Sequence, residues 1–104
     1  MKSVQLRPAA RQDRRQQITY YAQSAGEPIA QALLDALRDA QEQMARNPGI
    51  GSPRLGQELG VEGLRTWSIK NFPLAYWYFE RETEVDVVRL IGHRQDPARV
   101  EIND

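Results

Sequence analysis

The C-terminal half of the chain carries three short apolar runs separated by two polar breaks. The runs cover residues 64–69, 74–79 and 85–91, and each is rich in β-branched or aromatic residues and too short for a convincing helix. The breaks at 70–73 and 80–84 hold the Asn, Pro and charged residues that are typical of tight turns. Because parallel pairing would need a much longer crossover between strands, the pattern predicts an antiparallel meander.

The N-terminal part of the chain predicts one strand and a polar helix. Residues 2–6 alternate polar and apolar side chains, which is typical of a strand, and we expect this strand to join the meander. From Ala9 to about Ser24 the chain is rich in Gln and Arg and carries only a thin apolar stripe. Arg14 stands in that stripe, and we expect its methylene stem to lie over the sheet while its charged head reaches water.

The segment between Glu27 and Asn47 has the strongest periodic signal in the chain. Its apolar residues recur at spacings of three and four, which predicts an amphipathic helix with one face on the sheet. The residues of that stripe are Ile29, Leu33, Leu37, Ala40 and Met44. Since a very short turn at Gly26 separates this helix from the preceding one, we expect the two helices to form a hairpin.

Two segments flank the predicted meander. Residues 50–62 contain three glycines and a proline, and we expect a loop there. Residues 96–104 predict a short terminal helix or turn packed at the edge of the sheet. The sequence therefore predicts one α+β domain, residues 1–104, in which an N-terminal strand and a helical hairpin pack on an antiparallel sheet of three to four strands.

The composition indicates a small cytoplasmic protein without a cofactor. The 104 residues include no cysteine, which excludes disulfides and suits a reducing compartment, and neither a membrane-spanning run nor a signal peptide is apparent. The chain has 14 basic residues (Lys and Arg) and 14 acidic residues (Asp and Glu). A protein that binds RNA mainly through its phosphates usually has more basic than acidic residues, so the composition does not favour RNA binding. One histidine and the acidic residues spread through the hairpin tip make a weak case for a metal site, and the glycines lack the Lys-Ser/Thr of a phosphate loop.

The single histidine, His93, follows the last predicted strand and precedes Asp96 by three residues. An imidazole beside a carboxylate can act as a general base, because it titrates near neutrality and the carboxylate fixes its tautomer. The alternative, which we favour, is that His93 and Asp96 close a turn and cap the C-terminal segment. No cysteine nucleophile and no serine-nucleophile motif accompanies them.

Two arginines, Arg65 and Arg89, stand inside predicted strands, where an arginine is uncommon unless it is paired or faces a functional groove. Strict strand alternation places Arg89 on the face of Val87 and Ile91. For Arg89 a functional role and an internal salt bridge are equally supported, and for Arg65 we favour the structural interpretation. The candidate acidic partners are Glu58, Glu62 and Asp13.

Adjacent strands also carry a dense block of aromatic residues. Alternation sends Tyr76 and Tyr78 to one face of the sheet and Trp77 and Phe79 to the other. One pair is expected to pack against the helices. The other is expected to form an exposed apolar surface of the kind that binds a protein partner.

The order of strand, helical hairpin, Gly-rich loop and three-stranded meander resembles the RelE/ParE superfamily of bacterial toxins. The segments NPGIGSPR, GLRTWSIKNFPLAYWYF and VDVVRLIGHRQD carry the resemblance, which spans the whole chain and is greatest to the ParE branch. Arg14 and Gln17 differ from it, since relatives usually have aliphatic residues there. The resemblance implies a toxin of a type II toxin–antitoxin system, neutralised by a ParD-like or other cognate antitoxin in a hetero-oligomer, that inhibits DNA gyrase by protein–protein contact.

The resemblance, together with the side-chain chemistry, suggests two contact surfaces. We expect target contact at Arg89, His93, Arg94, Val100 and Ile102. We expect antitoxin contact in the groove between helices and sheet, through Leu33, Leu37, Tyr76, Trp77 and Tyr78. Neither surface requires nucleic acid, a membrane, a metal or a cofactor.

Two alternatives stay open at the level of sequence. One is a RelE-like endonuclease that cuts mRNA on the ribosome, with Arg65, Lys70, Arg89 and His93 as its catalytic cluster. The other is a decayed homologue that binds antitoxin without being toxic. The balanced charge, and the absence of a tyrosine after Tyr78, favour the ParE-like interpretation over the nuclease.

Overall fold

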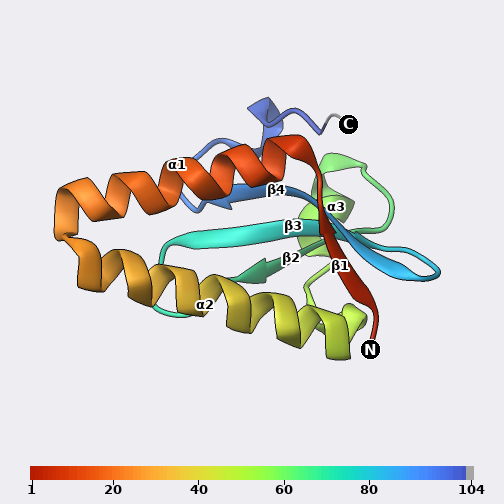
Figure 1. The fold of residues 1–104 in the computed structure, drawn as a ribbon. Helices are drawn as coiled ribbons and strands as arrows, with labels where there is room; N and C mark the ends of the chain where they lie inside the picture. The colour runs from red at the N-terminus through yellow and green to blue at the C-terminus, as the bar shows by residue number, and fades with distance from the viewer. Residues whose placement is uncertain (103–104) are drawn as a thin grey trace.

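A hairpin of two long helices lies across one face of a four-stranded sheet (Figure 1). The structure, a computed structural model, describes residues 1–102. Its elements are β1 (Ser3–Leu6), α1 (Pro8–Ala25), α2 (Glu27–Arg46), η1 (Pro48–Ile50), α3 (Arg54–Leu59), β2 (Leu64–Ser68), β3 (Leu74–Glu80), β4 (Glu84–Gly92) and η2 (Pro97–Arg99). The predicted α+β architecture, including the short C-terminal helix, is confirmed.

The strand order in the sheet is β1-β4-β3-β2. The predicted meander is confirmed, because β2, β3 and β4 pair with their sequence neighbours in antiparallel fashion. The expected all-antiparallel sheet needs one correction, since β1 pairs with β4 in parallel, with Val4 opposite Val85. The helical hairpin and two further strands separate β1 from β4, so no tight turn constrains their relative direction.

A β-bulge interrupts the pairing of β3 with β4. Tyr78 lies opposite Val87 and Trp77 lies opposite Arg89, which leaves Val88 as the extra residue. Val87 therefore belongs to the core under the helices, whereas Val88 and Ile91 belong to the core on the opposite face. The expectation that Arg89 shares a face with Val87 is wrong, because strict alternation does not hold through a bulge.

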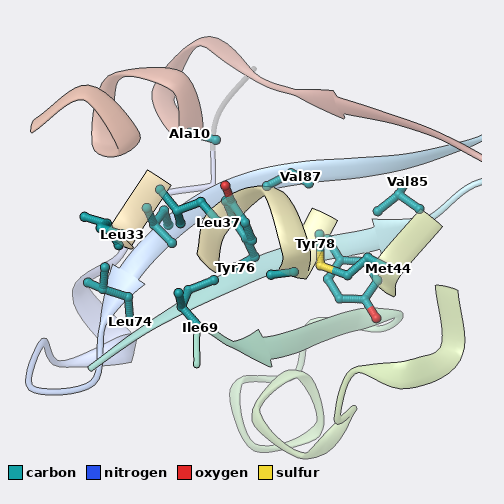
Figure 2. Packing of buried hydrophobic residues seen from close by; sticks show 12 residues of the cluster. Ala10, Leu33, Leu37, Met44, Ile69, Leu74, Tyr76, Tyr78, Val85 and Val87 are labelled. Atoms are coloured by element: carbon teal, nitrogen blue, oxygen red, sulfur yellow. The ribbon is translucent and has the colours of Figure 1, made fainter. Parts of the chain in front are cut away.

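The main core lies between the helical hairpin and the sheet (Figure 2). Four residues of the predicted α2 stripe are buried there, namely Leu33, Leu37, Ala40 and Met44. Each fully buried leucine contributes about 1.5–3 kcal/mol to folding relative to an exposed one. Ile29, which was assigned to the same stripe, is instead 42% exposed because it lies in the first turn of α2, at the end of the hairpin.

The segment predicted as a loop at 50–62 contains the short helix α3. A β-carbon on Gly56 would lie 2.6 Å from the carbonyl oxygen of Leu64 and 2.8 Å from that of Val61. A glycine is thus required for α3 to pack this closely against the start of β2. The helix supplies Leu55 and Leu59 to a second, smaller core on the face of the sheet opposite the hairpin.

Among the residues that the structure describes, no helix is both long enough and apolar enough to cross a membrane.

Candidate functional site

Arg89, a predicted target-contact residue, is held in a salt bridge with Asp13 of α1. Its Nε lies 2.7 Å from Asp13 Oδ2 and its Nη2 lies 3.0 Å from Asp13 Oδ1, and both side chains are largely buried. Asp13 Oδ2 also accepts a 3.0 Å hydrogen bond from the backbone N–H of Leu90. The hydrogen bond from Arg89 to Asp13 raises the pKa of Arg89, against the opposing effect of burial. Of the two interpretations offered by the sequence, the structure thus shows the internal salt bridge.

This salt bridge joins α1 to β4 just beyond the last residue of β4 that pairs with β1. β1 covers the edge of β4 only as far as Val87, and Asp13 supplies the next acceptor, to Leu90. Arg89 Nη1 also donates to the carbonyl oxygen of Glu101 at 2.9 Å. Arg89 therefore positions the C-terminal segment beside α1 rather than presenting its own charge to a partner.

Arg65 is likewise occupied by structural bonds. Its Nη1 donates to the carbonyl oxygens of Gly51, at 2.6 Å, and Gly49, at 3.3 Å, so its partners are backbone carbonyls and not the predicted glutamates. Lys70, in contrast, is exposed in the β2–β3 turn and makes no hydrogen bond or ion pair with any described residue. Arg65 on β2 and Arg89 on β4 are therefore both engaged in bonds within the fold, to backbone carbonyls and to Asp13 respectively.

His93 and Arg94 are exposed in the turn that follows β4. The backbone N–H of His93 donates to the carbonyl oxygen of Pro73 at 2.9 Å, which joins this turn to the turn between β2 and β3, and the N–H of Gln95 closes the turn on the carbonyl oxygen of Gly92 at 3.1 Å. Asp96 accepts a hydrogen bond from the N–H of Ala98 at 3.0 Å and so caps η2. No hydrogen bond joins His93 to Asp96 within the described residues, and the cap formed by Asp96 agrees with the interpretation that we favour.

A cavity of about 320 Å³ opens beside this turn on the face of the sheet opposite the hairpin. Its floor is formed by Trp77, Ala75 and Ile91, and His93 and Gln95 lie at its rim. Apolar floors with a few polar groups at the rim are typical of sites that accept an apolar side chain. The two remaining predicted target-contact residues, Val100 and Ile102, are half-buried and pack on the same smaller core.

The residues predicted to bind the antitoxin are core residues of this chain. Leu33, Leu37, Tyr76, Trp77 and Tyr78 are at most 2% exposed. The hydroxyl of Tyr78 donates to the carbonyl oxygen of Pro48 at 2.7 Å and accepts the N–H of Gly51 at 2.8 Å. The division of the aromatic residues between the two faces is as expected, but the expected exposed surface at Trp77 is wrong, because α3 and the C-terminal segment cover it.

An exposed apolar surface that the sequence analysis did not predict lies at the turn of the helical hairpin. Tyr20 is 59% exposed and Ile29 is 42% exposed. A groove of about 510 Å³ runs from Ile29 and Tyr21 to Phe72 of the β2–β3 turn. The rings of Tyr21 and Phe72 meet edge to face with centroids 5.2 Å apart. This surface, rather than the buried stripe of α2, offers apolar contacts to a partner.

No group of three or more His, Cys, Asp or Glu residues within 1–102 is arranged to hold a metal ion.

Comparison with known proteins agrees with this fold. The family model of the ParE toxin of type II toxin–antitoxin systems, parDE, matches residues 4–97. A solved chain of the chromosomal ParDE toxin–antitoxin system from P. aeruginosa superposes with a TM-score of 0.73 and 19% sequence identity, covering 88% of this chain and 96% of that chain. At that identity the superposition shows the fold alone. No curated protein matches significantly. Because the family model covers nearly all of the sequence, the chain belongs to the ParE toxin family of type II toxin–antitoxin systems.

Proposed function

We propose that this chain is a cytoplasmic toxin that inhibits DNA gyrase by direct protein–protein contact and is neutralised by a cognate, ParD-like antitoxin in a hetero-oligomer. The observation that carries this proposal is the match to the ParE toxin family over residues 4–97. The equal number of acidic and basic residues also suits a protein target better than a nucleic-acid one.

Binding rather than catalysis is supported by the positions of the candidate catalytic residues. A ribonuclease needs a cluster of cations that converge on one phosphate. Arg65 is bonded to backbone carbonyls, Arg89 is bonded to Asp13, and the two lie on strands separated by β3. His93 lies in the turn after β4, with no carboxylate bonded to it among the described residues.

The proposed target surface is the turn after β4 together with the C-terminal segment. Its exposed members are His93 and Arg94, and the cavity beside His93 can accept an apolar side chain of the target. Val100 and Ile102 line the adjoining edge, and Arg89 acts indirectly by holding the segment through Glu101. The antitoxin is proposed to cover the helical hairpin, beginning from the exposed Tyr20 and Ile29.

A supercoiling assay with purified gyrase tests this proposal. The wild-type chain should inhibit supercoiling and trap cleaved DNA, and Arg94→Ala should lose at least about tenfold in potency, since charged contacts at an interface centre are often worth more than 1.4 kcal/mol. Arg46→Ala is the matched control, because Arg46 is exposed at the end of α2 and, among the described residues, forms an ion pair with Glu42 alone. Full supercoiling in the presence of excess wild-type chain would contradict the proposal.

A further inference from the structure

The cavity beside His93 contains a hydrogen-bond donor that the fold leaves unused, the indole N–H of Trp77. Trp77 lines this cavity of about 320 Å³ and is only 2% exposed. The other tryptophan, Trp67, donates from Nε1 to Oε1 of Gln43 at 3.0 Å, whereas Trp77 Nε1 has no hydrogen-bond partner among the residues that the structure describes. A buried indole usually finds a partner for this N–H, so an unpaired one calls for an explanation.

This donor is not sealed inside the protein. Among the enclosed side-chain nitrogen and oxygen atoms in the described part of the chain, the Nε of Arg14 is the one without a partner. The fold encloses that atom, although the sequence led us to expect the charged head of Arg14 in water. Because Trp77 Nε1 also lacks a partner but is not enclosed, it belongs to the small part of the ring that stays exposed, and that part faces the cavity that Trp77 lines.

A second donor is held at the rim of the cavity by the turn after β4. Gln95 lines the cavity, and its Oε1 accepts a 3.0 Å hydrogen bond from the backbone N–H of Gly92. With the oxygen engaged in this way, the N–H groups of the Gln95 amide remain without a partner within the described structure. Thr66 and Ser68 also line the cavity, and each adds a hydroxyl that can donate. The polar part of the cavity is therefore rich in donors.

The charges around these donors favour a carboxylate as the ligand. No Asp, Glu, Lys or Arg of the described residues lines the cavity. In the adjoining segment, Arg94 and Arg99 are positive, and the carboxylate of Asp96 accepts from the N–H of Ala98. Asp96 also lies 3.7 Å from Arg99, so its charge is partly balanced. A phosphate is usually held by lysine or arginine, whereas uncharged N–H donors are enough to hold a single carboxylate.

We propose that this cavity binds a glutamate or aspartate side chain of the protein target, with the Trp77 indole N–H and the Gln95 amide donating to its carboxylate. The methylene stem of that side chain packs on the apolar floor formed by Ala75 and Ile91. The inference rests on the proposed function and refines it, because the side chain that enters the cavity is apolar along its stem and acidic at its tip.

Titration with sodium butyrate, an aliphatic carboxylate of about the size of a glutamate side chain, tests the site without any target protein. In proton–nitrogen NMR spectra of the free chain, the Trp77 indole signal should shift saturably with a Kd of about 1–50 mM, the range for a ligand of about six heavy atoms. The Trp67 indole signal is the internal control, because its N–H is already bonded to Gln43. The uncharged butyramide should bind at least about tenfold more weakly, since its own N–H groups would face donors.

Gln95→Glu replaces the amide donor with a negative charge, while a carboxylate oxygen can still accept from the N–H of Gly92. This variant should abolish the shift of the Trp77 signal and lose at least about tenfold in potency against gyrase, because like charges then meet in the cavity. The same spectra show whether the variant is folded. Gln23→Glu is the matched control, because Gln23 is exposed on α1 and the exchange alters the net charge equally, and it should retain both activities.

The outcomes separate this inference from the proposed function. If butyrate leaves the Trp77 signal as unmoved as that of Trp67, if butyramide binds as tightly as butyrate, or if Gln95→Glu inhibits gyrase as strongly as the wild type, the carboxylate site is wrong and the toxin assignment stands. If the wild-type chain binds butyrate but does not inhibit gyrase, the proposed function fails, and the assignment of the bound side chain to that target fails with it.

Discussion

Removing Asp13 should destabilise the fold more than any other exchange of a charged residue on α1. Asp13 accepts three hydrogen bonds, two from Arg89 and one from the N–H of Leu90, and it joins residues that are 76 and 77 positions apart in the chain. Asp13→Ala leaves the guanidinium of Arg89 without its counter-ion and the N–H of Leu90 without its acceptor. The open edge of β4 then loses the hydrogen bonds that join it to Asp13 of α1 beyond the end of β1.

The magnitude follows from the burial of the pair. Breaking a fully buried ion pair costs about 3–5 kcal/mol, but the side chains of Arg89 and Asp13 retain 20% and 13% of their exposure, so water screens part of the loss. We therefore expect Asp13→Ala to lower the free energy of unfolding by about 2–3 kcal/mol. For a domain of this length, that corresponds to a fall in Tm of roughly 10–20 °C.

Urea denaturation of the purified chain, followed by circular dichroism, measures this loss. Asp39→Ala is the matched control, because Asp39 is exposed on α2 and makes no hydrogen bond with a described residue, and it should change stability by less than about 0.5 kcal/mol. The double variant Asp13→Ala with Arg89→Met should regain part of the loss, since no unpaired charge then remains. If Asp13→Ala unfolds at the same urea concentration as the wild type, the salt bridge between Asp13 and Arg89 does not stabilise the fold.

Two further predictions concern acid stability and the short helix. Burial alone would raise the pKa of Asp86, but hydrogen bonds and charge from Arg7 and Arg81 outweigh it and lower the pKa below 3.8. Because the folded pKa lies below the unfolded one, this carboxylate stabilises the fold near neutral pH, and the contribution should disappear as the pH falls below about 4. Asp86→Asn should remove this fall in the free energy of unfolding below about pH 4. If the variant and the wild type lose stability equally over that pH range, Asp86 does not have the lowered pKa described here. Gly56→Ala should lower the unfolding free energy by about 1–3 kcal/mol in the same urea assay, because its methyl group would overlap two carbonyl oxygens, and an unaltered midpoint would show that α3 can move away.

The sequence predicted the architecture because local patterns determine most of it. The α2 stripe, the two tight turns and the alternation of Tyr76 with Trp77 each depend on near neighbours in the chain. The parallel pairing of β1 and the bulge at Val88 depend on contacts between distant segments, which no local pattern encodes. The sequence predicts a loop where the structure has α3, because glycine usually destabilises a helix. Gly56 is nevertheless required in α3, because a side chain there would clash with the start of β2.

The candidate site was predicted less well, because the role of a side chain depends on its partners. Arg89 was open to two interpretations in the sequence, and only the fold brings Asp13 within 2.7 Å of it. The aromatic block was correctly divided between two faces, yet both faces proved to be covered. Apolar character in a sequence does not distinguish a core residue from an interface residue, which is why Tyr20 and Ile29 were not foreseen as the exposed ones.

Controlled expression of this chain without an antitoxin would show whether it is a toxin that acts on DNA gyrase. DNA, RNA and protein synthesis should be followed separately from the moment of induction, together with chromosome integrity and the level of the chain itself. We expect DNA synthesis to stop first, with double-strand breaks, and co-expression of the cognate antitoxin to restore growth. Early arrest of translation with fragmented mRNA, or undisturbed growth while the folded chain is present, would contradict this expectation.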